Sequence, residues 1–329
     1  MKIYTEFTVC IICLQPPNDA FPQRQLTDEH IVSEFLGGKI IVKNVCKECN
    51  DKLGLRLEGP LSKNRYFKIY THSNGIKGKK DKLTNPLSGE YSYDGVKFRY
   101  EADFSLYQLP VIRHQPVADG GFEINASIDT KDLNKIEHDI FKIVSRRLKK
   151  SDKTLVEDKL KEDIKKIIES NKNNINIINQ PEIQVSFSLD FDQIALLALK
   201  ISYELLAWLV GEDFILSNEF DAYRSSLKNI TLHNEIKYST KNFHKVLIEL
   251  LKENTFFKVE DFSYIDYIFG VNKTLVIFIG GGCFVRIANL WINFEMPESL
   301  KNTFFIFSSD SKTGGYNFYR EEDIFLKKI

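Results

Sequence analysis

The stretches CIIC at residues 10–13 and CKECN at residues 46–50 decide how the first part of this chain folds. Each contains two cysteines separated by two residues, a spacing that lets both thiolates reach one tetrahedral metal ion. The predicted ligands of one structural Zn²⁺ ion are Cys10, Cys13, Cys46 and Cys49. Two disulfides, free thiols or a redox-active pair are the alternatives, but two pairs in this arrangement favour a metal.

The segment between the two pairs is long enough for two strands, so we expect a two-stranded insertion rather than a compact zinc finger. A module of this size buries little apolar surface, and a structural zinc ion would supply much of its folding energy. The fifth cysteine, Cys283, stands alone, and we expect it to be a buried small side chain.

Other chemistry-bearing residues lie around and between the cysteine pairs in a definite order. DEHIV occupies residues 28–32, two glycines follow at 37–38, Asn50 comes directly after the last cysteine, and Leu-Gly stands at 53–54. The order Cys-x-x-Cys, Glu-His-Ile, Gly-Gly, Cys-x-x-Cys-Asn, Leu-Gly resembles the four-cysteine type of the HNH endonuclease family across residues 8–58. The resemblance implies a ββα-metal fold, in which two strands and one helix surround a divalent ion.

The resemblance also implies roles for three residues. In the family, the acid before the histidine binds the catalytic ion and the residue after the last cysteine completes its site, which gives these roles to Glu29 and Asn50. Both offer oxygen ligands, which suit Mg²⁺ or Mn²⁺. Phosphodiester hydrolysis needs an activated water and a cation that stabilises developing charge. His30 is the only histidine of this region, and its neutral imidazole can accept the proton of that water.

Neighbouring side chains of a regular strand point to opposite faces, so Glu29 and His30 can serve one site only if the strand is bent or bulged. A partly buried strand histidine with a structural role is the alternative for His30. Asp28, directly before Glu29, could compete with it as the metal ligand.

The chain departs from the family pattern at three places. Ser33 stands where many relatives have a proline, and Glu58 stands where an aspartate often follows the Leu-Gly step. The middle asparagine of the family name has no secure match. Asn44 is the nearest candidate, and a simple turn role suits it equally well.

Residues 63–82 carry many bases with aromatic residues between them, a composition typical of a phosphate-binding surface. Candidate nucleic-acid contacts are Lys63, Arg65, Lys68, Lys79 and Lys80. The aromatic side chains could stack on bases, or they could pack in the core beneath a solvated basic face. A second basic cluster at 146–150 lies at a predicted helix end, where the helix dipole explains it as well as DNA does.

Composition bounds the class of protein. The 329 residues are 43% hydrophobic, and 45 Lys and Arg balance 45 Asp and Glu, which argues against a basic nucleic-acid coat. The sequence shows no long uninterrupted apolar run and no cationic start followed by an apolar segment, so we expect no membrane span and no signal peptide. These features, with cysteines in metal-binding pairs, predict a cytoplasmic protein.

We expect an α+β protein with two parts: a ββα-metal zinc module over residues 1–62, ending near Gly59-Pro60, and a larger mixed α+β domain over 63–329. Helical spacing predicts helices over 131–150, 153–170, 193–210, 218–228 and 241–253. Alternating patterns predict strands within 85–115 and at 185–189, 274–279, 284–290 and 304–307, with a hairpin turn at the glycines 280–282. Glu204, inside the most apolar helix, would need a partner if buried.

The function that these observations favour is a metal-dependent HNH endonuclease that hydrolyses DNA, in restriction, phage defence or a mobile element by family analogy. The larger domain would bind the target, a regulatory partner or ligand, or a second copy in a homodimer. The alternative is a non-enzymatic zinc module that binds nucleic acid or protein. An active site in the larger domain ranks last, because no catalytic motif is recognisable there.

Overall fold

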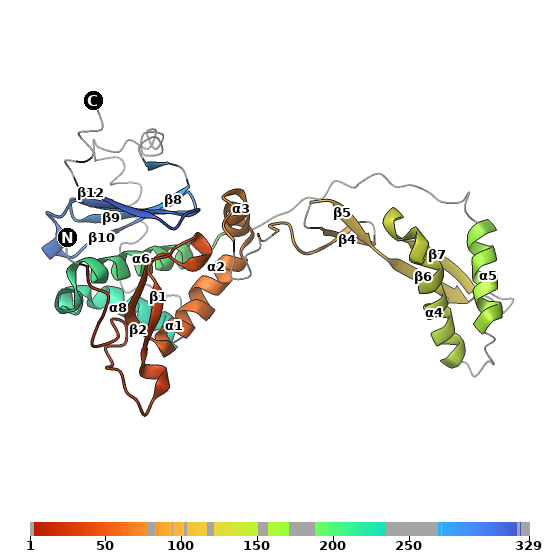
Figure 1. The fold of residues 1–329 in the computed structure, drawn as a ribbon, viewed down its shortest axis with the longest axis horizontal. Helices are drawn as coiled ribbons and strands as arrows, with labels where there is room; N and C mark the ends of the chain where they lie inside the picture. Colours follow the sequence, from red (N-terminus) through yellow and green to blue (C-terminus); the bar gives the residue numbers. More distant parts are fainter. Residues whose placement is uncertain are drawn as a thin grey trace. The chain divides into compact units, whose positions relative to one another are not determined.

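The computed structural model describes residues 3–77, 83, 85–93, 95–101, 104–116, 122–150, 157–170, 188–233, 269–270, 272–320 and 323. Its contacts divide the chain into two compact units: Met1–Pro86 with Phe187–Ile329, and Leu87–Ser186. Both contain helices and strands (Figure 1), which confirms the mixed α+β class. This grouping differs from the expected division at residue 62, because the N-terminal module shares its core with the end of the chain.

The cysteine-rich region folds as two strands followed by a helix, as the family resemblance implies. β1 (Leu26–His30) pairs antiparallel with β2 (Ile41–Cys46), and α1 (Lys47–Leu53) begins at the next residue. Short 3-10 turns lie on both sides of β1: η1 (Pro22–Arg24) and η2 (Glu34–Leu36).

The chain remains helical through Gly59-Pro60, where the sequence analysis placed a boundary. The elements after α1 are the π-helical turn η3 (Gly54–Glu58), α2 (Gly59–Lys63) and α3 (Arg65–Ser73). The amide of Gly59 donates to the carbonyl of Gly54, and Pro60 lies in the first turn of α2, where proline is tolerated. The first break comes at Asn64, whose extended backbone and side-chain oxygen cap α3.

After the second unit, the chain returns through one long helix and several short ones. They are α6 (Phe191–Val210), α7 (Glu212–Ile215), η6 (Asn218–Phe220), α8 (Asp221–Lys228) and η7 (Asn229–His233). The carboxylate of Asp190 caps α6 by accepting a hydrogen bond of 3.1 Å from the amide of Gln193. Gly211, with φ +88°, ends the helix.

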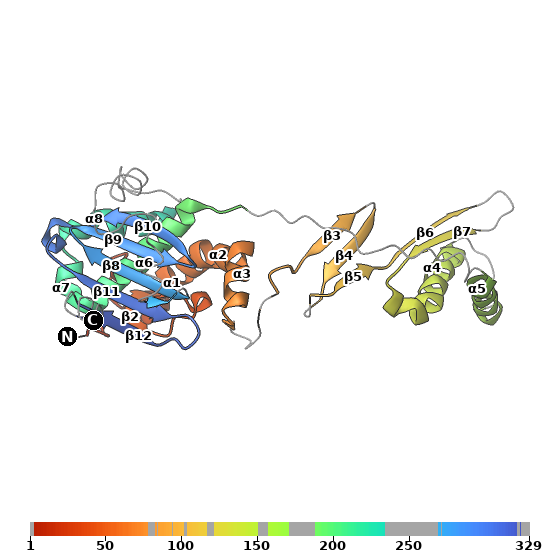
Figure 2. The same cartoon turned by 90° about the horizontal axis from the view of Figure 1, so that it is seen from above.

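A five-stranded antiparallel sheet closes the first unit, and Figure 2 shows its strands side by side in the order β10-β9-β8-β11-β12. Its strands are β8 (Lys273–Ile279), β9 (Gly282–Ile287), β10 (Leu290–Glu295), β11 (Phe305–Asp310) and β12 (Tyr316–Tyr319), with η9 (Glu298–Leu300) before β11. The hairpin turn at Gly280-Gly281 is confirmed. The expected strand 284–290 is wrong at its end, because Ala288 and Asn289 have φ of +48° and +66° and form a second hairpin turn. The strands β10 and β12 were not expected.

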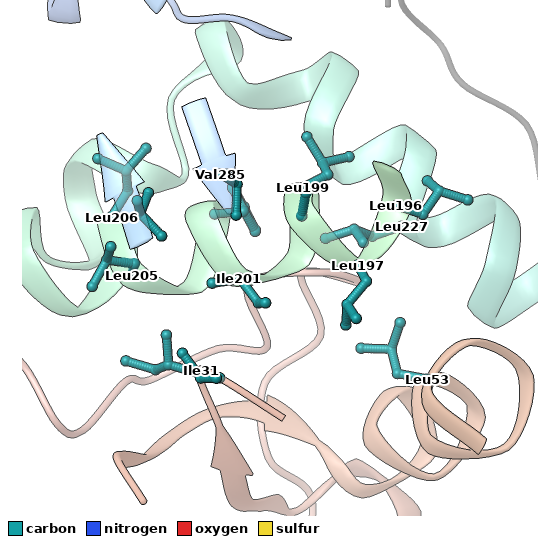
Figure 3. Packing of buried hydrophobic residues seen from close by; sticks show 14 of the residues in the cluster. Ile31, Leu53, Leu196, Leu197, Leu199, Ile201, Leu205, Leu206, Leu227 and Val285 are labelled. Carbon is teal, nitrogen blue, oxygen red and sulfur yellow. The ribbon is translucent and has the colours of Figure 1, made fainter. Parts of the chain in front are cut away.

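Helix α6 lies between the five-stranded sheet and the ββα module (Figure 1). Val285 of β9 approaches it from one side, and Ile31 and Leu53 of the module approach it from the other (Figure 3). Its residues from Ile194 to Trp208 are all buried. A helix that is apolar around most of its circumference needs such burial on both sides.

By length and composition α6 could also cross a membrane, which the sequence analysis did not expect, and among the described residues it is the one helix that passes this test. However, 83% of its apolar window is buried inside the protein. The two layers that cover it identify it as a core helix.

The second unit consists of hairpins and two helices. Its elements are β3 (Glu90–Tyr93), β4 (Val96–Tyr100), β5 (Leu106–Leu109), β6 (Val111–Pro116), β7 (Phe122–Ser127), η4 (Thr130–Lys135), α4 (Ile136–Lys150) and α5 (Glu157–Ser170). β3, β4 and β5 form one antiparallel sheet, and β6 pairs with β7. Of the strand expected at 185–189, residues 185–187 lie outside the described residues and 188–189 are not in a strand; the helix expected at 241–253 lies wholly outside them.

Replacing Leu197 with alanine should lower the free energy of unfolding by about 2–5 kcal/mol, because it leaves a cavity between α6 and Leu53 of the module. In urea titrations, the midpoints of tryptophan fluorescence and of zinc release should shift together, since α6 belongs to both layers. Phe191→Ala, at the exposed start of the same helix, is the control and should change stability by less than about 0.5 kcal/mol. A zinc-release midpoint that stays unchanged in Leu197→Ala would show that the module folds independently of α6.

Candidate metal centre and active site

The four paired cysteines meet at one point. Their sulfur atoms all lie within 4.8 Å of one another, and the Sγ atoms of Cys13 and Cys46 are 3.7 Å apart. Zinc–sulfur bonds of about 2.3 Å place the ligands of a tetrahedral site about 3.8 Å apart. The cysteines are free rather than disulfide-bonded, so the cluster fits a structural zinc ion.

The backbone holds the two cysteine pairs in place from different elements. Cys46 is the N-cap of α1 and Cys49 lies in the first turn of that helix. The first pair lies in a turn in which the amide of Leu14 donates to the carbonyl of Cys10 over 2.8 Å. The amide of Ile11, between the cysteines of that pair, donates to the carbonyl of Asn44 in β2 over 2.9 Å and ties the turn to the hairpin.

Asn44, the nearest match to the family's middle asparagine, is fully buried, and its side-chain amide makes no hydrogen bond. It lies where the register of the hairpin shifts. Thr27 pairs with Val45 but Glu29 pairs with Val42, so β2 has one more residue than β1 at this point. The extra residue lies in β2, whereas Glu29 and His30 themselves pair in regular register with Val42 and Ile41. The bend that would let both side chains serve one site stays a prediction.

Glu29 is buried and forms an ion pair with Lys200 of α6. The same ammonium donates to the backbone carbonyl of His30 over 2.7 Å and contacts Glu58 of η3 at 2.9 Å. It also lies 3.5 Å from Glu204, one helical turn further along α6. Glu204 therefore has a charged neighbour, although neither of its buried carboxylate oxygens makes a hydrogen bond.

Electrostatics keep this cluster charged at its centre. Burial disfavours the charge on Lys200, which has no exposed surface, but its three carboxylate neighbours outweigh that cost and raise its pKa well above the ordinary value. Burial also raises the pKa of Glu29 and, well above the ordinary value, that of Glu204, although Lys200 opposes both shifts. The pKa of Glu58 is lowered, because Lys200 and a hydrogen bond outweigh the effect of burial.

Two of the departures from the family pattern contact each other. The hydroxyl of Ser33, where relatives often have proline, donates to the carboxylate of Glu58 over 2.6 Å. A proline could not make this bond. Ser33 and Lys200 therefore both hold the carboxylate of Glu58 in place. Glu58 shares the Lys200 ammonium with Glu29, a contact that the sequence did not indicate.

The two remaining predicted residues lie in β1 and in the helix that follows β2. The imidazole of His30, at the end of the strand, is half-buried, and this burial lowers its pKa while the nearby Glu34 carboxylate opposes the shift. The side-chain amide of Asn50 in α1 donates to Thr27 Oγ1 over 3.1 Å and to the carbonyl of Asp28 over 3.0 Å. Asp28 itself is exposed. Glu29 and His30 thus both lie in β1, and hydrogen bonds join Asn50 of α1 to the same strand.

Among the described residues, the cysteine cluster is the one group of three or more Cys, His, Asp or Glu ligand atoms within reach of a single ion. Glu29, Glu58 and Glu204 instead surround an ammonium. The lysine was missed in the sequence analysis. Its signal was present, since Lys200 lies four residues before Glu204 in an otherwise apolar helix.

The aromatic side chains of α3 pack in or against the core, with Tyr66 partly exposed. Phe67 and Tyr70 are buried, and the hydroxyl of Tyr66 donates to the carbonyl of Ala288 over 2.6 Å. Lys63, Arg65 and Lys68 lie in α2 and α3, whereas Lys79 and Lys80 lie outside the described residues.

The HNH endonuclease family model matches residues 10–66, which include the four cysteines, Glu29, His30, Asn50 and Glu58. No curated protein and no solved structure matches the chain. The match confirms the resemblance for this segment. The N-terminal segment is therefore an HNH-type domain with a four-cysteine cluster, and nucleic acid is the class of molecule that such domains bind.

Replacing Cys49 with serine should abolish stoichiometric zinc binding, because serine at neutral pH does not replace a thiolate ligand. Metal analysis of the purified wild type should give about one zinc ion per chain, as one four-thiolate site requires. Cys283→Ala removes a buried thiol elsewhere in the core and should keep the zinc. Equal zinc contents in the wild type and Cys49→Ser would reject the four-cysteine site.

Proposed function

We propose that the protein is a metal-dependent HNH endonuclease that hydrolyses phosphodiester bonds in DNA. The observation that carries this proposal is the combination of the family match with a Glu29-His30 pair on β1 and Asn50 on the adjoining helix. A zinc module that only binds nucleic acid or protein would account for the cysteines but would leave this trio without a role.

His30 is the general base in this proposal. The lowered pKa of its imidazole favours the neutral form, which accepts a proton from the attacking water. The water's oxygen attacks phosphorus, and the bond to the leaving 3′ oxygen breaks. Water, rather than a protein nucleophile, is the attacking group in this scheme.

Glu29 and Asn50 would hold the catalytic ion, for which a carboxylate and an amide oxygen are suitable hard ligands. Mg²⁺ or Mn²⁺ held by these residues would supply positive charge to stabilise the phosphorane and the leaving oxygen. The donation from the amide nitrogen of Asn50 to Thr27 and Asp28 fixes the orientation of its side chain. The ion pair of Glu29 with Lys200 fixes the orientation of the carboxylate in the same way.

The rest of the chain is proposed to recognise the target, a regulatory partner or ligand, or a second copy of the protein. Each HNH site hydrolyses one strand, so a homodimer would suit double-strand cutting. We further propose a cytoplasmic enzyme of restriction or phage defence. The balance of 45 basic and 45 acidic residues supports a need for a partner or dimerisation before strong DNA binding.

Replacing His30 with alanine should reduce the single-turnover rate of plasmid cleavage at least ~10²-fold, because the base that activates water is lost. The measurement compares zinc-loaded proteins in Mg²⁺ or Mn²⁺, with an EDTA control. His138→Ala, at an exposed position of α4, is the matched control and should cleave like the wild type. Equal rates for the wild type and His30→Ala would reject the role of His30.

Replacing Lys63 and Lys68 together with glutamine should weaken DNA binding and make it less sensitive to salt. Removing one lysine from a DNA phosphate reduces the slope of log K against log salt by about 0.9, so the slope of the double variant should be smaller by about 2. The control is Lys301→Gln, because Lys301 forms an ion pair with Glu298 of η9. Fluorescence anisotropy with a labelled duplex gives the slopes, and identical slopes for all three proteins would place the DNA surface elsewhere.

A further inference from the structure

Lys200 is the residue through which the core helix reaches the proposed active site. Its side chain is fully buried, and its ammonium contacts oxygen atoms of β1, η3 and α6. A lysine in the core is rare, because removing an ammonium from water is costly unless it is paired and hydrogen-bonded. In a helix whose other buried residues are almost all apolar, the cluster needs a reason other than packing.

The contacts on β1 are the informative ones. Lys200 pairs with the carboxylate of Glu29 and donates to the backbone carbonyl of His30, so one ammonium holds two consecutive residues. This occurs beside the register shift that follows Thr27, where β2 has one more residue than β1. The side chains of two consecutive strand residues can serve one site only if the backbone departs from regular strand geometry and is held there.

The contact with η3 extends the same restraint to the helical side of the module. The Lys200 ammonium lies 2.9 Å from the carboxylate of Glu58, which also accepts the hydrogen bond from Ser33. A π-helical turn is uncommon and is often found at functional sites. The ammonium thereby joins β1 to the turn that continues the helix of Asn50.

We propose that Lys200 is a positioning residue of the nuclease site: it fixes the Glu29 carboxylate and the His30 backbone and so makes α6 part of the catalytic centre. This inference rests on the proposed nuclease function. It implies that residues 1–62 do not contain the whole site, because a residue far along the chain orients the proposed ligand. Outer partners of metal ligands typically contribute a factor of about 10–100 to metal affinity or activity.

A charge effect and a positioning effect predict opposite changes in metal affinity. A positive charge beside Glu29 opposes the binding of a second cation, so if Lys200 contributed only charge, its removal would raise the affinity for Mn²⁺. If Lys200 positions Glu29, its removal lowers that affinity. The sign of the change therefore separates the two roles.

The test is the double variant Lys200→Met, Glu204→Gln of the zinc-loaded full chain, which removes the paired lysine and carboxylate of α6 together. Electron paramagnetic resonance of Mn²⁺ gives the dissociation constant without any cleavage, and plasmid cleavage at saturating Mn²⁺ gives the rate. We expect affinity to fall about 10–100-fold and the rate to fall as well. Ser202→Ala, which removes a hydroxyl that donates to the carbonyls of Ala198 and Leu199 in the same helix, is the control for a small change in buried α6.

Zinc content and the urea midpoint are measured for every variant. If the methionine variant does not fold, Lys200→Gln with Glu204→Gln keeps hydrogen-bonding groups of similar size, and it should show the same fall in Mn²⁺ affinity. A folded variant that binds Mn²⁺ as tightly as the active wild type, or more tightly, would overturn the positioning role alone. A wild type that neither binds Mn²⁺ nor cleaves would overturn the proposed function and this inference together.

Discussion

The burial of α6 on both sides is the constraint on which the first unit depends. The ββα module covers one side of the helix and the C-terminal sheet covers the other, so neither layer has a complete apolar core without it. Small modules of this kind usually depend on their metal for folding. Here the module has a second source of stability, because Ile31 and Leu53 pack on a helix from far along the chain.

The same helix carries a charge into that core. Lys200 lies on α6 but contacts Glu29, His30 and Glu58 of the module, so the packing that stabilises the unit also determines the surroundings of the candidate site. The C-terminal sheet contributes indirectly. Gly37 has φ +86° and a side chain there would collide with the backbone of Ser311, which fixes the glycine turn of the module against the loop after β11. The HNH-type segment is thus built into a larger unit.

Much of the module could be predicted from sequence because its signals are local. Cysteine spacing predicted the cluster, and the order of short motifs predicted two strands and a helix. The turn at Gly280-Gly281 was also correct, since it depends on neighbouring residues. The roles of His30, Glu29 and Asn50 stay predictions.

The predictions that failed have a common physical cause, because the features concerned depend on tertiary contacts or on unusual backbone geometry. The Ala288-Asn289 turn lacks the glycine that usually indicates a hairpin, and Gly59-Pro60 continues a helix because a π-helical turn precedes it. Lys200 could not be placed in the site, because its partners are distant in the sequence.

The most direct test of the central claim is the chemistry of the ends that the wild type makes on plasmid DNA. Zinc-loaded full-length protein is incubated with plasmid in Mn²⁺ or Mg²⁺, and the nicked product is treated with DNA ligase. Hydrolysis at the leaving 3′ oxygen predicts nicks that appear only with the divalent ion and that ligase reseals, because they carry 5′-phosphate and 3′-hydroxyl ends. Cleavage that persists in EDTA, nicks that ligase cannot reseal, or no cleavage with either ion would contradict the account.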